Sequence, residues 1–291
     1  MPGPTLPGPL VDGAWLEAHL GDPALRVIES TSYLDPSTDP GKPYVVRSGR
    51  ADWEAGHIPG SAFADVNGEL AEPHPTLNFT FPSAPRFAAA MSALGVEDGT
   101  VVVIYDRGGP MWATRVWWLL RAYGFDDAAV LDGGWDTWTA EERPVTTDPP
   151  PGRVGHFLPR PRPALIASRD EVLARSGDGA ACVLNALSPA VYAGRENRYG
   201  RPGRIPGSVN VFAQHLLDPA SRRFRPEAEL RERLGAVGAL GQERVIAYCG
   251  GGISATVDAF ALTLLGAQDV AVYDGSMTEW LSDPALPVET G

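Results

Sequence analysis

The sequence predicts an α/β protein with two domains, each a mostly parallel β-sheet flanked by helices. Three observations lead to this prediction. The chain has 291 residues, which suits two domains better than one. Short apolar runs alternate with helical stretches, a pattern typical of strand–helix–strand units. Three sequence motifs also occur twice in the same order, once in each half of the chain.

The repeated motifs indicate an internal duplication. The first half contains GHIPGSAFADVN at 56–67, VVVIYDRGG at 101–109 and AVLDGGWDTW at 129–138. The second half contains GRIPGSVNVF at 203–212, VIAYCGGG at 245–252 and VAVYDGSMTEW at 270–280. A bias in composition would scatter glycine and proline without keeping this order and spacing.

Apolar runs of four to six residues predict the buried strands. They are RVIES, VVVIYD and AVLDGG in the first copy and CVLNAL, VIAYC and VAVYDG in the second. Helices are predicted at 84–95, 226–238 and 254–265, and Gly266 is expected to end the last of these. Parallel sheets bind ligands beyond the carboxyl ends of their strands, which makes the loop after VIAY the candidate site.

A proline-rich stretch at 143–165 separates the two copies. Proline has no backbone N–H for helices or sheets, so an extended, semi-rigid linker is expected there. We therefore place the N-terminal domain at 1–145, the linker at 146–160 and the C-terminal domain at 161–291.

Composition argues against several classes of function. The 24 basic and 36 acidic side chains give a formal net charge of −12, which disfavours nucleic acids and anionic membranes as partners. There is no apolar segment of membrane-spanning length and no recognisable signal peptide, so we expect a cytoplasmic protein. The only cysteines, Cys182 and Cys249, form no CxxC pair, which excludes a cysteine-rich zinc site. A disulfide between them is conceivable, but two separate thiols are favoured, with Cys182 inert in its apolar strand.

Cys249 is the candidate nucleophile. It follows the VIAY strand directly and precedes three glycines and a helix for which Ser254 is a candidate N-cap. Glycines let backbone N–H groups turn inward, so the loop is expected to form an anion-binding cradle at the helix N-terminus, where thiolate is favoured over thiol. The cradle amides belong to Gly250, Gly251, Gly252, Ile253 and Ser254. The first copy has Asp106 at the matching position and is expected to be catalytically silent.

A cysteine loop before a helix is also found in cysteine phosphatases. These enzymes need an arginine six positions after the cysteine to bind phosphoryl oxygens. Ala255 occupies that position here, so phosphatase chemistry is disfavoured.

The HIPGS and RIPGSVN pair, the CGGGISA loop and the DGG and DGS motifs resemble the tandem rhodanese sulfurtransferases, which include thiosulfate sulfurtransferase and 3-mercaptopyruvate sulfurtransferase. The resemblance implies two rhodanese-like domains, the first inactive and the second active. It also implies that Cys249 takes a sulfane sulfur from a small anionic donor and becomes a persulfide. The sulfur then passes to cyanide or another thiophilic acceptor, without a metal or organic cofactor.

The loop departs from the pattern of both donor classes. It lacks the basic residues common in thiosulfate enzymes, and Gly251 stands where mercaptopyruvate enzymes have a hydroxyl. A histidine expected in the first domain of the mercaptopyruvate enzymes falls at Phe79, whereas their aspartate is matched by Asp65. Because the hydroxyl and the histidine are missing, thiosulfate is slightly favoured as the donor, with 3-mercaptopyruvate as the alternative.

The donor-binding arginine that the resemblance implies is replaced by Leu187. Arg195 is the expected substitute, and Arg204 and Tyr33 are further substrate-binding candidates. A basic cluster before IPGS either lies in a solvated loop or attracts an anionic donor into an acidic protein. Its members are Arg198, Arg201 and Arg204.

Two other classes of function remain open. One is a carrier that delivers persulfide sulfur to a thiol protein, which would transfer sulfur rapidly only with that partner present. The other is a non-catalytic rhodanese module, in which Cys249 would show no advantage in alkylation over an ordinary thiol.

Overall fold

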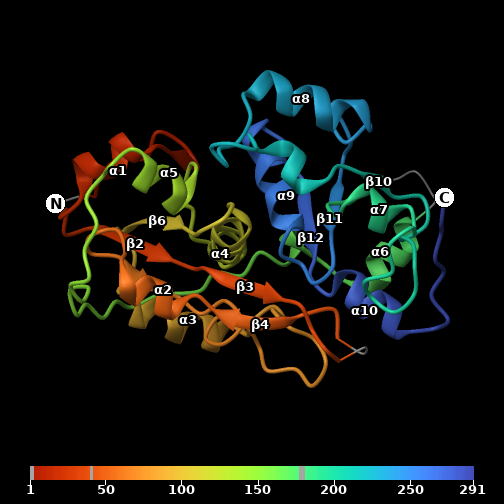
Figure 1. Ribbon diagram of the computed structural model, residues 1–291, viewed down its shortest axis with the longest axis horizontal. Helices are drawn as coiled ribbons and strands as arrows, with labels where there is room; N and C mark the ends of the chain where they lie inside the picture. The colour runs from red at the N-terminus through yellow and green to blue at the C-terminus, as the bar shows by residue number, and fades with distance from the viewer. Residues whose placement is uncertain (1–2, 40–41, 177–180) are drawn as a thin grey trace.

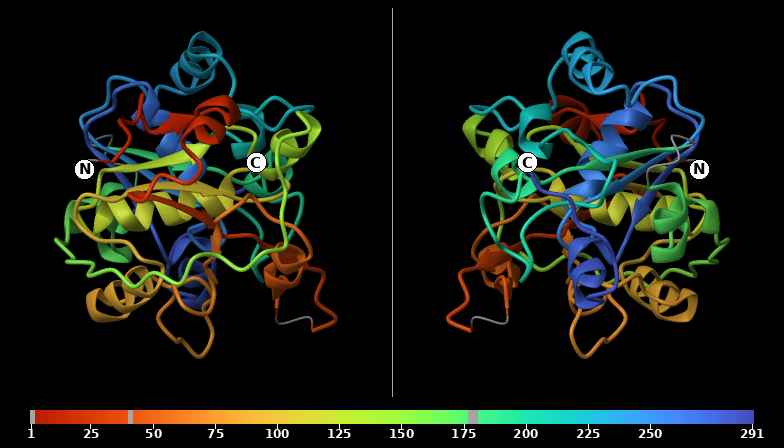
Figure 2. Two further views of the ribbon diagram at one scale, coloured as in Figure 1. Left: turned by 90° about the vertical axis from the view of Figure 1, so that its left-hand side faces the viewer. Right: turned by 90° about the vertical axis from the view of Figure 1, so that its right-hand side faces the viewer.

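The computed structural model describes residues 3–39, 42–176 and 181–291. Its two main sheets have five parallel strands each, with helices packed on both faces (Figures 1 and 2). The strand order is β1–β7–β6–β2–β5 in the first sheet and β10–β9–β11–β12–β8 in the second. The predicted fold class of two parallel α/β units is therefore confirmed.

The first unit contains the elements before residue 141. Its sheet consists of β1 (Leu10–Val11), β2 (Leu25–Glu29), β5 (Ala62–Phe63), β6 (Val101–Tyr105) and β7 (Ala128–Leu131). Its helices are α1 (Gly13–His19), α2 (Arg50–Ala55), α3 (Ala84–Ala93), α4 (Met111–Ala122) and α5 (Gly134–Ala140). An antiparallel hairpin of β3 (Ser32–Asp35) and β4 (Val45–Ser48) is added to this unit.

The second unit repeats the same strand arrangement. Its sheet consists of β8 (Ile166–Ala167), β9 (Cys182–Asn185), β10 (Val209–Asn210), β11 (Val245–Tyr248) and β12 (Val270–Tyr273). Its α-helices are α6 (Arg169–Arg175), α7 (Pro189–Tyr192), α8 (Glu227–Ala236), α9 (Ala255–Leu264) and α10 (Ser276–Ser282). Two 3₁₀ turns are η1 (Pro163–Leu165) and η2 (Ala213–Leu216). Gly266 follows α9 with a φ of +85°, as expected of a glycine that ends a helix.

The strands separate three apolar layers. In β6, Val101, Val103 and Tyr105 face a core shared with α1 and α5, whereas Val102 and Ile104 face a core shared with α3 and α4. The latter core continues through α9 into the second unit, and a third core lies between the second sheet and α6 and α10. The two units are therefore joined by a common apolar core.

The IPGS turn is held in the same way in both copies. The Tyr105 hydroxyl lies 3.2 Å from Ile58 N and 3.0 Å from Ser61 Oγ. The equivalent distances around the Tyr248 hydroxyl are 3.2 and 2.8 Å. Each IPGS turn is thus hydrogen-bonded to the last residue of a central strand, β6 before the Asp106 loop and β11 before the Cys249 loop.

The helices α4 and α9 meet at the centre of the interface (Figure 1). The rings of Trp117 and Phe260 pack edge-on, with centroids 4.8 Å apart. The hydroxyls of Thr114 and Thr256 are 2.8 Å apart and buried. These threonines hold matching positions in the duplication, so the units meet through equivalent residues.

Reciprocal hydrogen bonds connect the units on either side of these helices. The Phe224 N–H donates to Asp132 Oδ1 at 2.9 Å, and the Phe81 N–H donates to Asp274 Oδ2 at 2.7 Å. The two aspartates begin the DGG and DGS motifs. Each copy therefore uses the same residue to hold a loop of the other copy.

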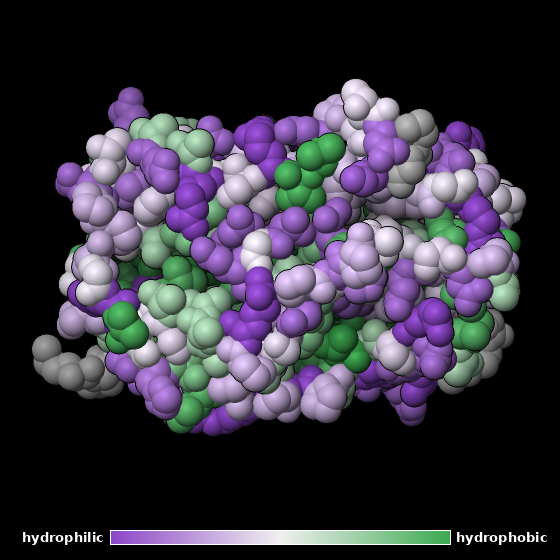
Figure 3. All heavy atoms as spheres, turned by 90° about the horizontal axis from the view of Figure 1, so that it is seen from below, coloured by the Kyte–Doolittle hydropathy of each residue, from purple (hydrophilic) through white to green (hydrophobic). Residues whose placement is uncertain are grey.

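The proline-rich segment runs along the first unit. Backbone N–H groups of Gly155, Arg160 and Arg162 donate to carbonyls at the ends of α3 and α4 at 2.8, 2.8 and 2.7 Å. In the face seen from below, hydrophobic side chains lie in small separate groups among hydrophilic ones (Figure 3). No described helix has the length and apolar character needed to cross a membrane. The domain boundaries at 145 and 160 stay a prediction.

The two interface threonines should be coupled energetically, so replacing both should cost less stability than the sum of the two single replacements. Thr114→Val or Thr256→Val leaves a buried hydroxyl with one partner fewer, which we expect to lower the free energy of unfolding by about 1 kcal/mol. The double variant removes both hydroxyls, so its loss should be smaller than the sum of the single losses. Urea unfolding of the four proteins measures this coupling. Strictly additive losses would contradict it.

Candidate active site at the Cys249 loop

Cys249 lies directly after β11, at the carboxyl edge of the second sheet, and only 2% of its surface is exposed. The loop from 249 to 254 leads into α9. At the start of α10, the N–H groups of Met277 and Thr278 donate to the carbonyls of Cys249 and Gly250 at 3.1 and 2.9 Å. These two loop carbonyls are thereby directed at α10.

The loop has N–H groups available for an anion. Among the described residues, no protein acceptor is bonded to the backbone N–H groups of Gly250, Gly251, Ile253, Ser254 and Ala255. Unpaired N–H groups at a helix N-terminus provide the partial positive charge that binds anions. The expectation for Gly252 needs correction, because its N–H donates to Ser276 Oγ at 3.1 Å.

Ser276 fixes the shape of this loop from the start of α10. Its hydroxyl accepts the N–H groups of Cys249 and Gly252 at 3.0 and 3.1 Å and donates to the Tyr273 carbonyl at 2.8 Å. It has a φ of +50°, a conformation that favours glycine, and the matching residue of the first copy is Gly134. Sequence reasoning missed Ser276, although the contrast between DGS and DGG was a usable signal.

Ser254 precedes α9 but does not cap it. It has an α-helical conformation and its side chain accepts no helix N–H. An N-cap side chain reaches the helix N–H groups from an extended conformation, so the capping expectation is wrong here. The Ser254 hydroxyl instead lies 4.0 Å from Met111 Sδ of the first domain.

In the first copy, a carboxylate fills the corresponding helix N-terminus. Asp106 is buried, and its Oδ2 accepts the N–H groups of Trp112 and Ala113 at 2.8 and 3.1 Å. Burial raises the pKa of Asp106 well above its usual range, although these two hydrogen bonds act in the opposite direction. In the first copy, the Asp106 side chain therefore binds the N–H groups at the start of the helix, whereas the second copy has a cysteine at the matching position and, within the described residues, leaves such N–H groups unpaired.

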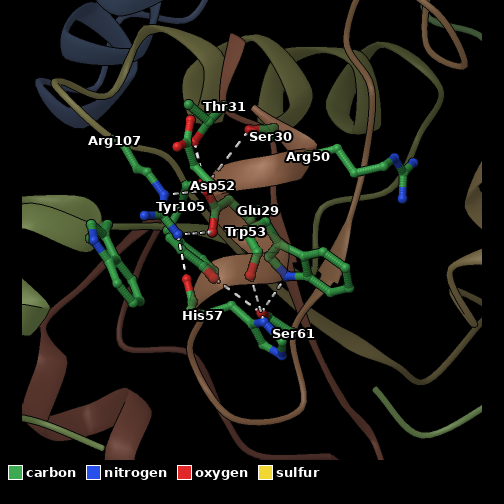
Figure 4. Close-up of polar contacts among 12 residues, drawn as sticks. Glu29, Ser30, Thr31, Arg50, Asp52, Trp53, His57, Ser61, Tyr105 and Arg107 are labelled. Carbon is green, nitrogen blue, oxygen red and sulfur yellow. Dashed lines mark hydrogen bonds and ion pairs between the residues drawn. The ribbon is translucent and has the colours of Figure 1, made fainter. Parts of the chain in front are cut away.

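A second buried carboxylate, that of Glu29, binds the arginine of the first-copy loop (Figure 4). Arg107 forms an ion pair with Glu29, with 2.7 Å between Nε and Oε1, and donates to the Gly56 carbonyl at 2.5 Å. The Thr31 hydroxyl donates to the same carboxylate at 2.9 Å. At the matching strand position the second copy has Asn185, so its loop is not closed by such an ion pair.

A cavity of about 400 Å³ opens between the domains beside the Cys249 loop. The first domain contributes the hairpin end at 42–46 and residues of the loop at 67–80, and the second contributes Gly251 and the start of α10. The residues of chemical interest in its lining are Lys42, Tyr44, His74, Asn78 and Thr278.

Two tyrosine hydroxyls lie against the glycines of the loop. A Cβ atom at Gly250 would overlap Tyr199 Oη, and one at Gly251 would lie 3.4 Å from Tyr44 Oη. Burial raises the pKa of Tyr44 to about 12 and also raises the pKa of Tyr199, and a negative charge at Cys249 would act on both in the same direction. Glycine at these two positions therefore leaves room for hydroxyls from outside the loop.

The arginines of the segment before IPGS have different roles. Arg204 is buried, pairs with Glu289 and donates to the Gly291 carbonyl at 2.7 Å, and Arg201 donates to the Asp283 carbonyl at 2.9 Å. Both thus hold the C-terminal segment. Arg195 is exposed, and a role in donor binding stays a prediction for it and for Arg204.

Arg198 is the arginine of this segment whose charge reaches the site. It acts on the hydroxyls of both Tyr44 and Tyr199 and partly offsets the rise in their pKa.

Asp65 and Tyr33 do not line the cavity within the described part of the chain. Asp65 Oδ1 accepts the N–H groups of Asn67 and Gly68 at 3.0 and 2.9 Å, which shapes the loop that leads to the cavity. Tyr33 lies in β3 with the Arg47 guanidinium 4.1 Å above its ring. Their proposed contact with substrate stays a prediction.

Arg115 connects the first domain with the Cys249 loop. Its side chain is fully buried, pairs with Asp274 at 2.6 Å and donates to the carbonyls of Gly252 and Phe79 at 3.3 and 2.5 Å. A Cβ at Gly252, which has a φ of +71°, would lie 2.7 Å from the Asp274 carbonyl oxygen. The position of the loop therefore depends on both domains.

Both cysteines are free thiols. Cys182 is partly buried at the start of β9, and burial raises the pKa of its thiol to about 11. Within the described residues, no group of three or more His, Cys, Asp or Glu side chains is arranged as metal ligands.

Asp106→Asn should stabilise the protein at neutral pH. The amide keeps an oxygen for the N–H groups of Trp112 and Ala113 and cannot ionise, so folding no longer has to bury a group that is ionised in the unfolded chain. The free energy of unfolding at pH 7 should therefore rise by about 1 kcal/mol. Because the folded-state pKa is raised, the carboxyl is protonated in both states at low pH, and the gain should vanish below about pH 4. Unfolding curves from about pH 3 to 8 test this, and a variant less stable than the wild type at pH 7 would refute it.

Comparison with known proteins agrees with this arrangement. A family model described as a rhodanese-like domain matches residues 14–141 and 168–283. The thiosulfate/3-mercaptopyruvate sulfurtransferase 2 of Arabidopsis thaliana is 32% identical, over 96% of this chain and 86% of the relative. The 3-mercaptopyruvate sulfurtransferase of Rattus norvegicus is 31% identical, over 96% and 94% respectively. The thiosulfate sulfurtransferase of Gallus gallus is 31% identical, over 93% and 92%.

A solved structure shows the same architecture. The crystal structure of SseA from Escherichia coli, described among 3-mercaptopyruvate sulfotransferases, superimposes with a TM-score of 0.81 at 27% identity. The match covers 92% of this chain and 98% of that protein. The chain therefore belongs to the rhodanese family of sulfurtransferases and contains two rhodanese-like domains.

Proposed function

We propose that Cys249 accepts a sulfane sulfur from a small anionic donor, carries it as a persulfide and passes it to a thiophilic acceptor. One observation carries this proposal: the buried cysteine stands before a helix N-terminus with unpaired N–H groups, where the first copy binds a carboxylate. A persulfide is also an anion, so the same kind of N–H groups can stabilise it. Sulfur transfer through a covalent enzyme intermediate predicts ping-pong kinetics.

For the donor, we propose 3-mercaptopyruvate, with thiosulfate as the alternative. The preference for thiosulfate depended on a hydroxyl missing at Gly251 and a histidine missing at Phe79. The Tyr44 hydroxyl lies against Gly251, and His74 lines the cavity, which supplies polar groups that the loop itself lacks. The rat relative is named for 3-mercaptopyruvate alone, which also supports this donor, whereas the Arabidopsis relative is named for both donors.

Two cavity-lining side chains suit a keto acid. Lys42 is the single lysine of the chain, and its ammonium can pair with a carboxylate. His74 Nδ1 lies 3.2 and 3.0 Å from the N–H groups of Thr76 and Leu77 and accepts both, so the ring presents Nε2–H as a donor.

Incubation with 3-mercaptopyruvate or thiosulfate should add one sulfur to the peptide that contains Cys249. Mass spectrometry measures the added mass, and cyanide should remove it. Cys249→Ser should abolish the addition, whereas Cys182→Ser is the matched cysteine control and should retain it. An unmodified Cys249 with both donors would overturn the proposal. A persulfide that only a thiol protein can discharge would favour the carrier alternative.

Ser276→Ala should slow sulfur transfer from either donor. The variant leaves the N–H groups of Cys249 and Gly252 without their acceptor, and a misplaced loop should lower kcat/KM by about 10- to 100-fold. Ser282→Ala is the matched control on α10, because the Ser282 hydroxyl is exposed and donates to the Glu279 carbonyl at 2.7 Å. Wild-type rates in Ser276→Ala would show that the hydroxyl does not position the site.

A further inference from the structure

We propose that Tyr44 donates the proton that the carbon skeleton of a mercapto keto acid takes up when its sulfur moves to Cys249. This inference rests on the proposed function of Cys249 and adds a catalytic residue from the other domain. It gives the β3–β4 hairpin, which has no equivalent strand pair in the described part of the second unit, a direct part in the reaction.

The hairpin carries Tyr44 to the site. The residue directly precedes β4, and the hairpin extends from the first domain towards α10 (Figure 1). Only 7% of the Tyr44 surface is exposed, its ring centroid lies 6.4 Å from that of Phe79, and its hydroxyl is hydrogen-bonded to the Asn78 side chain. These contacts hold the hydroxyl against Gly251, two residues after the nucleophile.

Among the neighbouring hydroxyls named below, that of Tyr44 both lies beside the Cys249 loop and belongs to a residue that lines the cavity without donating to the loop backbone. The hydroxyls of Tyr44 and Tyr199 both lie against glycines that follow Cys249, Tyr44 against Gly251 and Tyr199 against Gly250. Of these two, Tyr44 lines the cavity through which a donor would enter. The Thr278 hydroxyl also lines the cavity but donates to the Gly250 carbonyl at 2.7 Å, so its proton is already engaged.

The proposed step balances without an oxidant or a reductant. The Cys249 thiolate attacks the sulfur of HS–CH₂–CO–COO⁻, an S–S bond forms and the C–S bond breaks. The electron pair of the broken bond remains on the three-carbon fragment as the enolate of pyruvate. The methylene carbon takes the proton of the Tyr44 hydroxyl and becomes a methyl group. The tyrosinate then recovers a proton from the Cys–S–SH group, which leaves the persulfide anion in the cradle.

Thiosulfate needs no such proton. Attack of the Cys249 thiolate on its outer sulfur forms the same persulfide and releases sulfite, so no carbon–sulfur bond breaks. The two donors therefore load the same cysteine by reactions that differ in their need for an acid. General acids of this kind contribute about 10²- to 10⁴-fold to a rate.

The state of the Tyr44 hydroxyl fits this role. Burial and the charge on Cys249 hold the pKa of Tyr44 at about 12, so the hydroxyl is protonated at neutral pH. Arg198 and the Asn78 side chain act in the opposite direction and favour the tyrosinate that forms transiently.

Single-turnover loading of Cys249 by each donor tests the assignment. In Tyr44→Phe, persulfide formation from 3-mercaptopyruvate should slow by about 100-fold, whereas formation from thiosulfate should slow by less than about 5-fold. Tyr199→Phe is the matched control, because it removes a second hydroxyl beside Cys249 and should leave the ratio of the two rates unchanged. Loading by 3-mercaptopyruvate should also be slower in D₂O for the wild type and lose this isotope effect in Tyr44→Phe.

The possible results separate the two proposals. Equal slowing with both donors, or no slowing in Tyr44→Phe, would overturn the role of Tyr44 and leave Cys249 as the sulfur carrier. Loading of the wild type by thiosulfate alone would also overturn the role of Tyr44. Failure of both donors to load the wild type would overturn the proposed function itself. Loading of Tyr44→Phe by thiosulfate, with a thermal unfolding curve, shows that the variant is folded.

Discussion

The first N–H groups of the central helix in each domain lack partners within the helix, and this constraint shapes both copies of the duplicated fold. In the first domain, the carboxylate of Asp106 accepts N–H groups at the start of α4. In the second, the loop before α9 has no such side chain, and Cys249 stands at the corresponding place. A carboxylate that belongs to the chain is a permanent partner for the helix. A sulfur anion could instead be formed, extended by one sulfur atom and released, so under the proposed function the same fold provides a structural element in one copy and a reaction centre in the other.

The first domain also forms part of the candidate site in the second. Arg115 of α4 reaches the Gly252 carbonyl and Asp274, so the first domain holds the loop from behind. The β3–β4 hairpin of the same domain brings Lys42 and Tyr44 to the lining of the cavity. Loss of the first domain would therefore remove one wall of the site as well as the apolar core that α4 and α9 share. This dependence explains in physical terms why a domain without a nucleophile accompanies one that has it.

The sequence predicts the elements that local patterns determine. The six buried strands and Cys249 follow from residues close together in the chain, and the duplication and the replacement at Asp106 follow from comparing such local motifs between the two halves. The sequence alone did not reveal the partners that come from elsewhere in the fold. Arg204 pairs with Glu289, which lies 85 positions later, so its part in holding the C-terminal segment was not visible. Ser276 and Tyr44 act on the loop from α10 and from the other domain, and the positive φ of Ser276 is a backbone property that its residue type does not suggest.

A crystal structure of the protein after exposure to a sulfur donor tests the central claim most directly. The account predicts one additional sulfur atom on Cys249 Sγ, with the N–H groups of the loop between residues 250 and 255 at hydrogen-bonding distance from the terminal sulfur. The first-copy loop should be unchanged, with Asp106 still bound to the start of α4. A terminal sulfur that points away from these N–H groups, or an additional sulfur on Cys182, would contradict the account.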